Sequence, residues 1–205
     1  MEDNILRSGR PNWYTGDHST RIFRLRAKPI ELLIAMIAGS HRSNVLFIAP
    51  GYPSGRPGDY RGIFVHNLVQ ALKNEGYRIT IMTSAIHPED EPYIKIDESE
   101  EIFRFRFWSE GKPLGEYRRI PVIRMITYLW SALRCGRRII RHRSFDILHS
   151  HFLVPGGLIG SILSARSKIP HLLTVHGREA RMSAHNRIVR PIARWTVKRA
   201  KALTF

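Results

Sequence analysis

The sequence predicts an α/β fold, a doubly wound parallel sheet with helices on both faces. Along residues 43–205, short apolar segments rich in strand-forming residues alternate with segments of helical periodicity. The clearest unit spans residues 146–179 and reads strand, turn, helix, turn, strand, with the sequence DILHSHFLVPGGLIGSILSARSKIPHLLTVHGRE. Both of its strands are short apolar segments rich in strand formers, which is typical of strands buried on both faces of a parallel sheet.

The first half of the domain has the pattern of a βαβ unit. Residues 44–49 predict a strand, residues 50–62 a glycine-rich loop, residues 63–74 a helix and residues 77–83 a second strand. The helix has an apolar face made of Phe64, Leu68, Ala71 and Leu72. Gly76 suits a helix C-cap, and the crossover connection is expected to be right-handed.

The remaining elements continue the alternation of strands and helices. In a strand predicted at 102–108, three phenylalanines alternate with Arg104 and Arg106, which favours an edge-like position with one wet face. A long helix is predicted at 121–141, and its apolar stripe consists of Ile123, Ile126, Trp130 and Leu133. A helix over 187–200 and the start of a strand at 202–205 complete the predicted sheet.

The charge of the chain is unusual and unevenly distributed. The formal net charge is +16, and residues 115–205 hold 18 Lys and Arg against three acidic residues. Such a surface favours polyanions, whether nucleic acid, anionic lipid or phosphorylated ligands. The single cysteine, Cys135, excludes an internal disulfide and fits a reducing compartment. We expect a cytoplasmic protein and leave open a peripheral position on the cytoplasmic membrane face.

Residues 1–42 do not fit the pattern of the domain. A polar, basic stretch precedes the apolar run at 32–38, and Glu31 stands directly before that run. We predict a disordered or loosely docked leader. An interfacial amphipathic helix and a targeting segment remain as alternatives.

Polar residues end both strands of the central unit. His149 and His151 are two residues apart and so face the same side of their strand, while His176 follows the next strand. In open parallel sheets, ligands bind outside the carboxyl ends of the strands. A histidine there can hydrogen-bond a hydroxyl or a phosphate, although a capping or core histidine is the alternative. We expect no metal, because neither a cysteine nor a clear third ligand is nearby.

The glycine-rich loop, residues 50–62, is a second candidate site. Glycines allow the backbone to approach a ligand closely, and the helix that follows begins where anions bind well. The glycine spacing matches neither a dinucleotide-binding motif nor a P-loop. A flexible surface loop is the alternative.

Taken together, these motifs resemble a known family. D-I-L-H-S-H, then P-G-G, then P-x-L-L-T-V-H-G-R-E occur in the order found in the amino-terminal half of GT-B glycosyltransferases of family 4. These are retaining enzymes with two Rossmann-like domains facing across a cleft. The resemblance covers residues 43–205 and implies one half of a GT-B architecture. The carboxyl-terminal donor domain is absent from this sequence, so we expect a second domain or chain to complete the activity.

The resemblance also implies roles for individual residues. It places His176 beside the transferred sugar as the catalytic residue, and His151 at the cleft, with His149 packed. The cleft-facing pair of the loop would be Arg61 and Gly62. Substrate-binding roles extend to Gly177, Arg178 and Glu179; Glu179 would orient Arg178 or bind an acceptor hydroxyl, and a surface position stays open. The donor would be a nucleotide sugar, with no cofactor, and the acceptor a glycan or lipid-linked sugar.

The end of the long helix has two interpretations. Four cations cluster there: Arg134, Arg137, Arg138 and Arg141. They suit a solvated helix end, or they form a patch for an anionic membrane, as a basic helix does in several members of the resembling family. Nucleic acid is disfavoured because stacking aromatics beside the basic residues are sparse. The alternative to a transferase is therefore a non-catalytic module bound through this basic face to membrane or another polyanion.

Overall fold

The structure, a computed structural model, describes residues 43–56, 58–117 and 121–204. The predicted leader at 1–42 lies outside the described residues. The strands are β1 Asn44–Ile48, β2 Arg78–Ala85, β3 Tyr93–Lys95, β4 Glu100–Arg106, β5 Ile147–His151, β6 His171–Thr174 and β7 Ala202–Thr204. The helices are α2 Ile63–Asn74, α3 Val122–His142, α4 Leu158–Ser167, α5 Gly177–His185 and α6 Val189–Arg199.

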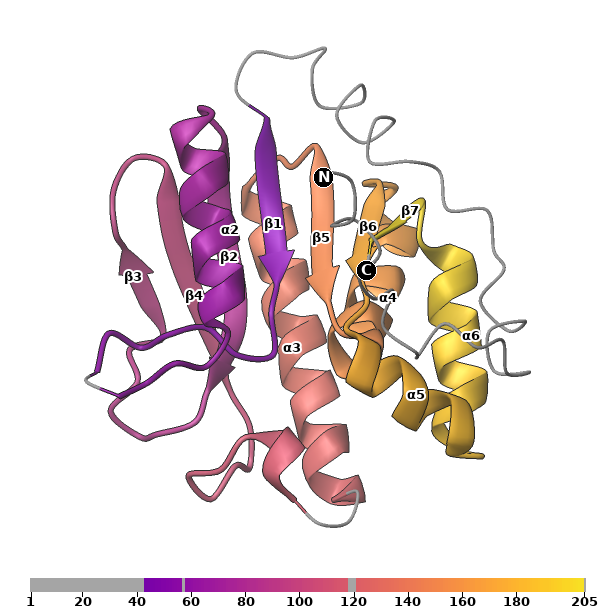
Figure 1. The fold of residues 1–205 in the computed structure, drawn as a ribbon. Coiled ribbons are helices and arrows are strands. Elements are labelled where there is room, and N and C mark those ends of the chain that lie inside the picture. Colours follow the sequence, from indigo (N-terminus) through magenta and orange to yellow (C-terminus); the bar gives the residue numbers. More distant parts are fainter. Residues whose placement is uncertain (1–42, 57, 118–120, 205) are drawn as a thin grey trace, which may run out of the picture.

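The seven strands form one sheet in the order β3-β4-β2-β1-β5-β6-β7 (Figure 1). All neighbouring strands are parallel except β3, which runs antiparallel to β4. Strand order reverses direction between β1 and β5, so the chain winds outward in both directions from the centre. The predicted doubly wound α/β sheet is confirmed.

Helices cover both faces of the sheet, and each face has its own core (Figure 1). Alternation along β1 sends Phe47 toward α2 and Leu46 toward α3 and α4, and both side chains are fully buried. In a third cluster, Leu173 of β6 packs against Ala193 and Val197 of α6, so that α6 covers the same face of the sheet as α4. Strands buried on both faces explain why the sequence shows continuous apolar runs there.

The predicted edge position of the phenylalanine-rich strand is wrong. β4 pairs with β2 on one side and with the three-residue strand β3 on the other. Arg104, expected on a wet face, is only 6% exposed, because it lies beneath the glycine-rich loop and donates to the Pro53 carbonyl. Three residues of strand, Tyr93–Lys95, are too few to produce a periodic signal.

Of the predicted apolar stripe of α3, only Leu133 packs against the core of the sheet. Ile123, Ile126 and Trp130 are 61–63% exposed. The buried face instead consists of Tyr128, Ala132, Gly136 and Ile139. Small residues on this face allow close packing, since a Cβ on Gly136 would lie 2.5 Å from a Leu163 methyl carbon of α4. Hydrophobicity alone therefore placed three exposed residues, Ile123, Ile126 and Trp130, on the buried face.

Candidate active site

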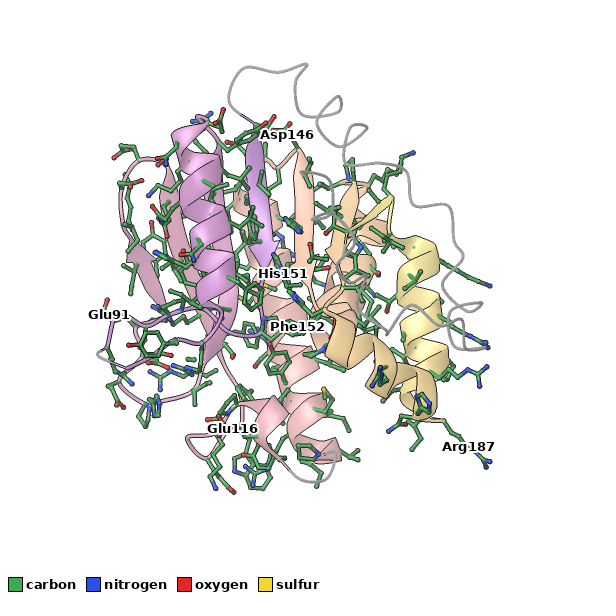
Figure 2. The ribbon with its side chains drawn as sticks, viewed as in Figure 1. Glu91, Glu116, Asp146, His151, Phe152 and Arg187 are labelled. Carbon is green, nitrogen blue, oxygen red and sulfur yellow. The ribbon has the colours of Figure 1, made fainter. Side chains whose placement is uncertain are left out.

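The carboxyl ends of the parallel strands bring the predicted histidines together. The His151 ring stacks on His149 at 4.6 Å and on His176 at 5.7 Å between centroids. His151 and Phe152 lie where β5 ends, at the opposite end of that strand from Asp146 (Figure 2). His149 is packed as expected, with Nε2 2.8 Å from the Thr174 hydroxyl. Residues 25 positions apart in sequence thus form one aromatic stack.

His151 is the middle ring of this stack, between His149 and His176. It is 1% exposed, and neither ring nitrogen has a hydrogen-bond partner among the described residues. Burial, followed by the charge of His176, lowers the pKa of His151 to about 4. His151 is therefore neutral near pH 7. It supports the His176 ring from below, and its predicted contact with substrate stays a prediction.

His176 is the outermost histidine of the stack, and its pKa is lowered by burial. Its ring lies 4.6 Å from Phe64 and 4.5 Å from Phe152, measured between centroids. Nε2 of His176 is buried and makes no hydrogen bond with the described residues. The predicted catalytic residue therefore has an unused polar nitrogen, covered by two phenylalanine rings.

Sequence reasoning missed both phenylalanines. Phe64 belongs to the apolar face predicted for α2, yet it is 41% exposed and its edge meets His151 and His176. Phe152 has φ +69°, a conformation that costs a non-glycine residue on the order of 1–3 kcal/mol. The position of Phe152, directly after a buried strand, was the available signal.

Glu179 is partly buried and binds main chain rather than lying on the surface. Its Oε1 accepts hydrogen bonds from the Leu153 N–H (2.8 Å) and the His176 N–H (3.2 Å). It therefore ties the turn after β5 to the start of α5, and burial raises its pKa to about 7. Gly177 is exposed at the start of α5, where a Cβ would meet no neighbour within 4 Å. The Arg178 side chain lies outside the described residues.

The glycine-rich loop is held together by internal bonds. Asp59 accepts from Nε and Nη2 of Arg61, both at 2.7 Å, and also from the Ser54 N–H and hydroxyl. These contacts, led by Arg61, lower the pKa of Asp59. The two ends of the loop touch at Gly62, where φ is +66° and a Cβ would lie 2.1 Å from the Gly51 carbonyl oxygen.

A cavity of about 350 Å³ opens beside the stack, and we call it the carboxyl-edge cavity. The predicted pair Arg61 and Gly62 lines it, as do both phenylalanines. Most of its other wall is apolar: Pro50, Ile86, Pro113, Leu114, Met125, Tyr128, Val154 and Pro155. The loop, the start of α3 and the turn after β5 therefore enclose one apolar space next to His176.

The basic cluster of α3 is fully on the surface. Arg134, Arg137, Arg138 and Arg141 are all exposed. Within the described residues none of the four has an ion pair, and Arg134 lies 5.4 Å above the Trp130 ring. No described helix is long and apolar enough to cross a bilayer. The described part of the chain also lacks any cluster of three or more His, Cys, Asp or Glu placed to hold a metal ion.

Comparison with known proteins places the chain among glycosyltransferases. It is 28% identical over 157 residues to a Bacillus subtilis glycosyltransferase named for teichuronic acid biosynthesis, covering 69% of this chain and 38% of that protein. It is 42% identical over 57 residues to an uncharacterized glycosyltransferase of Methanocaldococcus jannaschii, covering 28% of this chain and 16% of that one. The chain thus spans well under half the length of these two relatives.

Two solved chains of sucrose-phosphate synthase from Thermosynechococcus elongatus share the fold. One has TM-score 0.56 and 16% identity, covering 79% of this chain and 42% of the synthase chain. The other has TM-score 0.50 and 17% identity, with coverages of 73% and 70%. The model of Glycosyltransferase Family 4 matches residues 62–205, which include every predicted site residue except Arg61. The chain belongs to glycosyltransferase family 4.

Proposed function

We propose that this chain is the acceptor-side domain of a retaining glycosyltransferase, which moves a sugar from a nucleotide sugar to a glycan or lipid-linked acceptor. The observation that supports this most directly is the meeting of His176, Phe64 and Phe152 beside a cavity at the carboxyl edge of a parallel sheet. Ligands of open α/β sheets bind at this edge.

His176 would act as a neutral imidazole. Its lowered pKa leaves it uncharged near pH 7. Nε2 can then form one hydrogen bond with a hydroxyl of the transferred sugar, as donor or acceptor according to the tautomer. Glu179 fixes the main chain of His176, and His151 supports its ring. Arg178 and Gly177 stand next in the chain as candidate acceptor contacts.

A second lobe would complete the reaction. Departure of a nucleoside diphosphate requires pre-placed donors or cations for its developing charge. Arg61 is the one cation that lines the described carboxyl-edge cavity, and Asp59 already binds it through two nitrogens. The groups that grip the diphosphate would therefore come from a facing donor domain, in the same chain or in another.

The test is reconstitution. The chain is assayed alone and with a carboxyl-terminal family 4 domain, using UDP-glucose, UDP-N-acetylglucosamine and GDP-mannose as donors, and the anomeric configuration of the product is read by NMR. We expect turnover only with both domains, retention of configuration, and loss of at least tenfold in kcat for His176→Ala. His142→Ala, at an exposed histidine of α3, is the control. Robust turnover by the chain alone would contradict the two-lobe proposal.

A second candidate function is attachment to an anionic membrane, and the exposed residues of α3 favour it. Val122, Ile123, Ile126 and Trp130 are 61–63% exposed and precede the four arginines on the same helix. Apolar residues followed by cations fit the interface of an anionic bilayer, where each arginine contributes about 1 kcal/mol. We propose a peripheral position on the cytoplasmic membrane face, whether or not the domain is catalytic.

Liposome flotation separates this candidate from a solvated helix. Vesicles of pure phosphatidylcholine are compared with vesicles that also contain about 30 mol% phosphatidylglycerol, a typical loading. Each type is tested at low and at high salt. We expect binding only to the anionic vesicles, weakened by salt and by the double change Arg137→Gln with Arg138→Gln. Trp130→Ala should reduce binding at any salt concentration. Equal flotation with both vesicle types would rule out the electrostatic part of the proposal.

A further inference from the structure

We infer that the carboxyl-edge cavity binds the hydrocarbon chain of a lipid-linked acceptor. This inference rests on the proposed acceptor-side function and chooses the lipid-linked acceptor over a free glycan. The cavity lies between the glycine-rich loop, the start of α3 and the turn after β5, and its volume is about 350 Å³.

The wall of the cavity offers little to a sugar. Of its polar side chains, Ser84 donates to the Pro50 carbonyl at 2.9 Å, while Arg61 is bound by Asp59. A sugar in this space would lose its hydration without gaining equivalent hydrogen bonds. A hydrocarbon chain would leave water and contact Phe64, Met125 and Phe152, which is favourable.

Helix α3 connects the cavity to an apolar outer surface. Met125 lines the cavity, whereas Ile123 and Ile126 of the same turns are 63% and 61% exposed. The first turns of α3 therefore present apolar side chains both inward and outward, and the four exposed arginines of the helix follow about two to four turns later. If the first turns of α3 lay in the headgroup region of a membrane, both their exposed apolar residues and the arginines that follow would have partners there. A lipid chain leaving the membrane at these turns would reach the cavity that Met125 lines.

The location of the cavity also fits the chemistry proposed for His176. Phe64 and Phe152 line the cavity on one side and touch the His176 ring on the other. An acceptor whose chain occupies the cavity would therefore carry its polar head next to His176. The two phenylalanines would separate the hydrocarbon from the reacting sugar.

Binding of n-alkyl phosphates tests the inference without any sugar donor. Hexyl, octyl and decyl phosphate are titrated into the full chain below their micelle concentrations by calorimetry. We expect affinity to increase about threefold to fourfold per added methylene until the cavity is full. Met125→Trp, which fills the cavity, should weaken decyl phosphate binding at least tenfold. Asn67→Trp, at an exposed position of α2, should change it less than twofold.

Affinity that is independent of chain length, or equal effects of the two tryptophans, would overturn the inference. A decyl phosphate with a terminal diazirine provides a second measurement on the unaltered chain, which does not depend on the folding of Met125→Trp. Crosslinks to residues 113–115, 125 or 152–155 support the cavity, and crosslinks confined to the outer face of α3 refute it. Sugar transfer to a lipid-free acceptor without alkyl binding would leave the proposed function standing and remove this inference alone.

Discussion

The ring of Phe64 packs edge-on against His176, with centroids 4.6 Å apart and planes at 62°. Nε2 of His176 is buried in this arrangement and has no hydrogen-bond partner in the described structure. Phe64 is the second residue of α2 and is 41% exposed, although its ring also contacts His151 and Phe152. The histidine proposed to contact the sugar is therefore covered in part by a side chain that is itself well exposed.

Phe64→Ala should expose His176 and raise its pKa toward the ordinary value near 6.5. The reason is that burial is what lowers the pKa of His176. An NMR titration of the histidine ring protons measures the change. Ile63→Ala provides the matched control, because Ile63 is equally exposed at 41% but makes no ring contact with the histidines. An unchanged His176 titration in Phe64→Ala would show that Phe64 does not shield it.

Glu179→Ala should destabilise the domain by roughly 2–4 kcal/mol, because it leaves the N–H groups of Leu153 and His176 without their acceptor. Glu179→Gln retains an acceptor oxygen and should cost less than half as much. Urea denaturation of both variants measures the difference. Equal losses would mean that the carboxylate charge, and not the acceptor oxygen, holds this turn.

Acid should destabilise the domain below about pH 6.5. His151 and His171 have pKa values of about 4 because they are buried. Their neutral forms are favoured in the folded state, so stability is present above the unfolded pKa near 6.5 and is lost as pH falls toward 4. The loss can reach about 3 kcal/mol per histidine. Urea denaturation at pH 7.5, 6 and 5 measures it, and a flat profile would contradict the burial of these rings.

Glu179 should oppose this trend. Its folded pKa is raised from 4.5 to about 7, so the stability it contributes is present below pH 4.5 and is lost as pH rises through 7. Glu179→Gln removes that contribution. The variant should therefore lose stability more steeply than the unaltered chain between pH 7.5 and 5. Parallel profiles would show that Glu179 does not titrate in this range.

Gly62→Ala should destabilise the domain by more than about 2 kcal/mol, because φ is +66° and a Cβ would overlap the Gly51 carbonyl oxygen at 2.1 Å. Gly55→Ala is the comparison: its φ is +84°, but a Cβ there meets no neighbour within 4 Å. At Gly55 only the unfavourable backbone conformation should matter, and the expected loss in the free energy of unfolding is on the order of 1 kcal/mol. Thermal unfolding of the two variants separates close packing from backbone preference.

Local pattern was sufficient for most of the fold. Continuous apolar runs identified β1, β2, β5 and β6, and the order of strand, loop and helix led to the correct doubly wound sheet. It also brought His151 and His176 to one edge, because the carboxyl ends of parallel strands coincide. The pattern failed on α3, where small residues determine which face is buried. Ala132 and Gly136 face the sheet, whereas the larger Ile126 and Trp130 are exposed.

The amino-acid sequence by itself determined the class of fold, the family and the strand ends at which polar residues gather, since these depend on periodicity and on residue order. Only the tertiary structure decided which of these residues are accessible. It buried His151, covered Nε2 of His176 with Phe64 and turned Glu179 toward two backbone N–H groups. Such outcomes depend on side chains from distant segments competing for the same space, and that competition leaves no mark on the periodicity of any one segment.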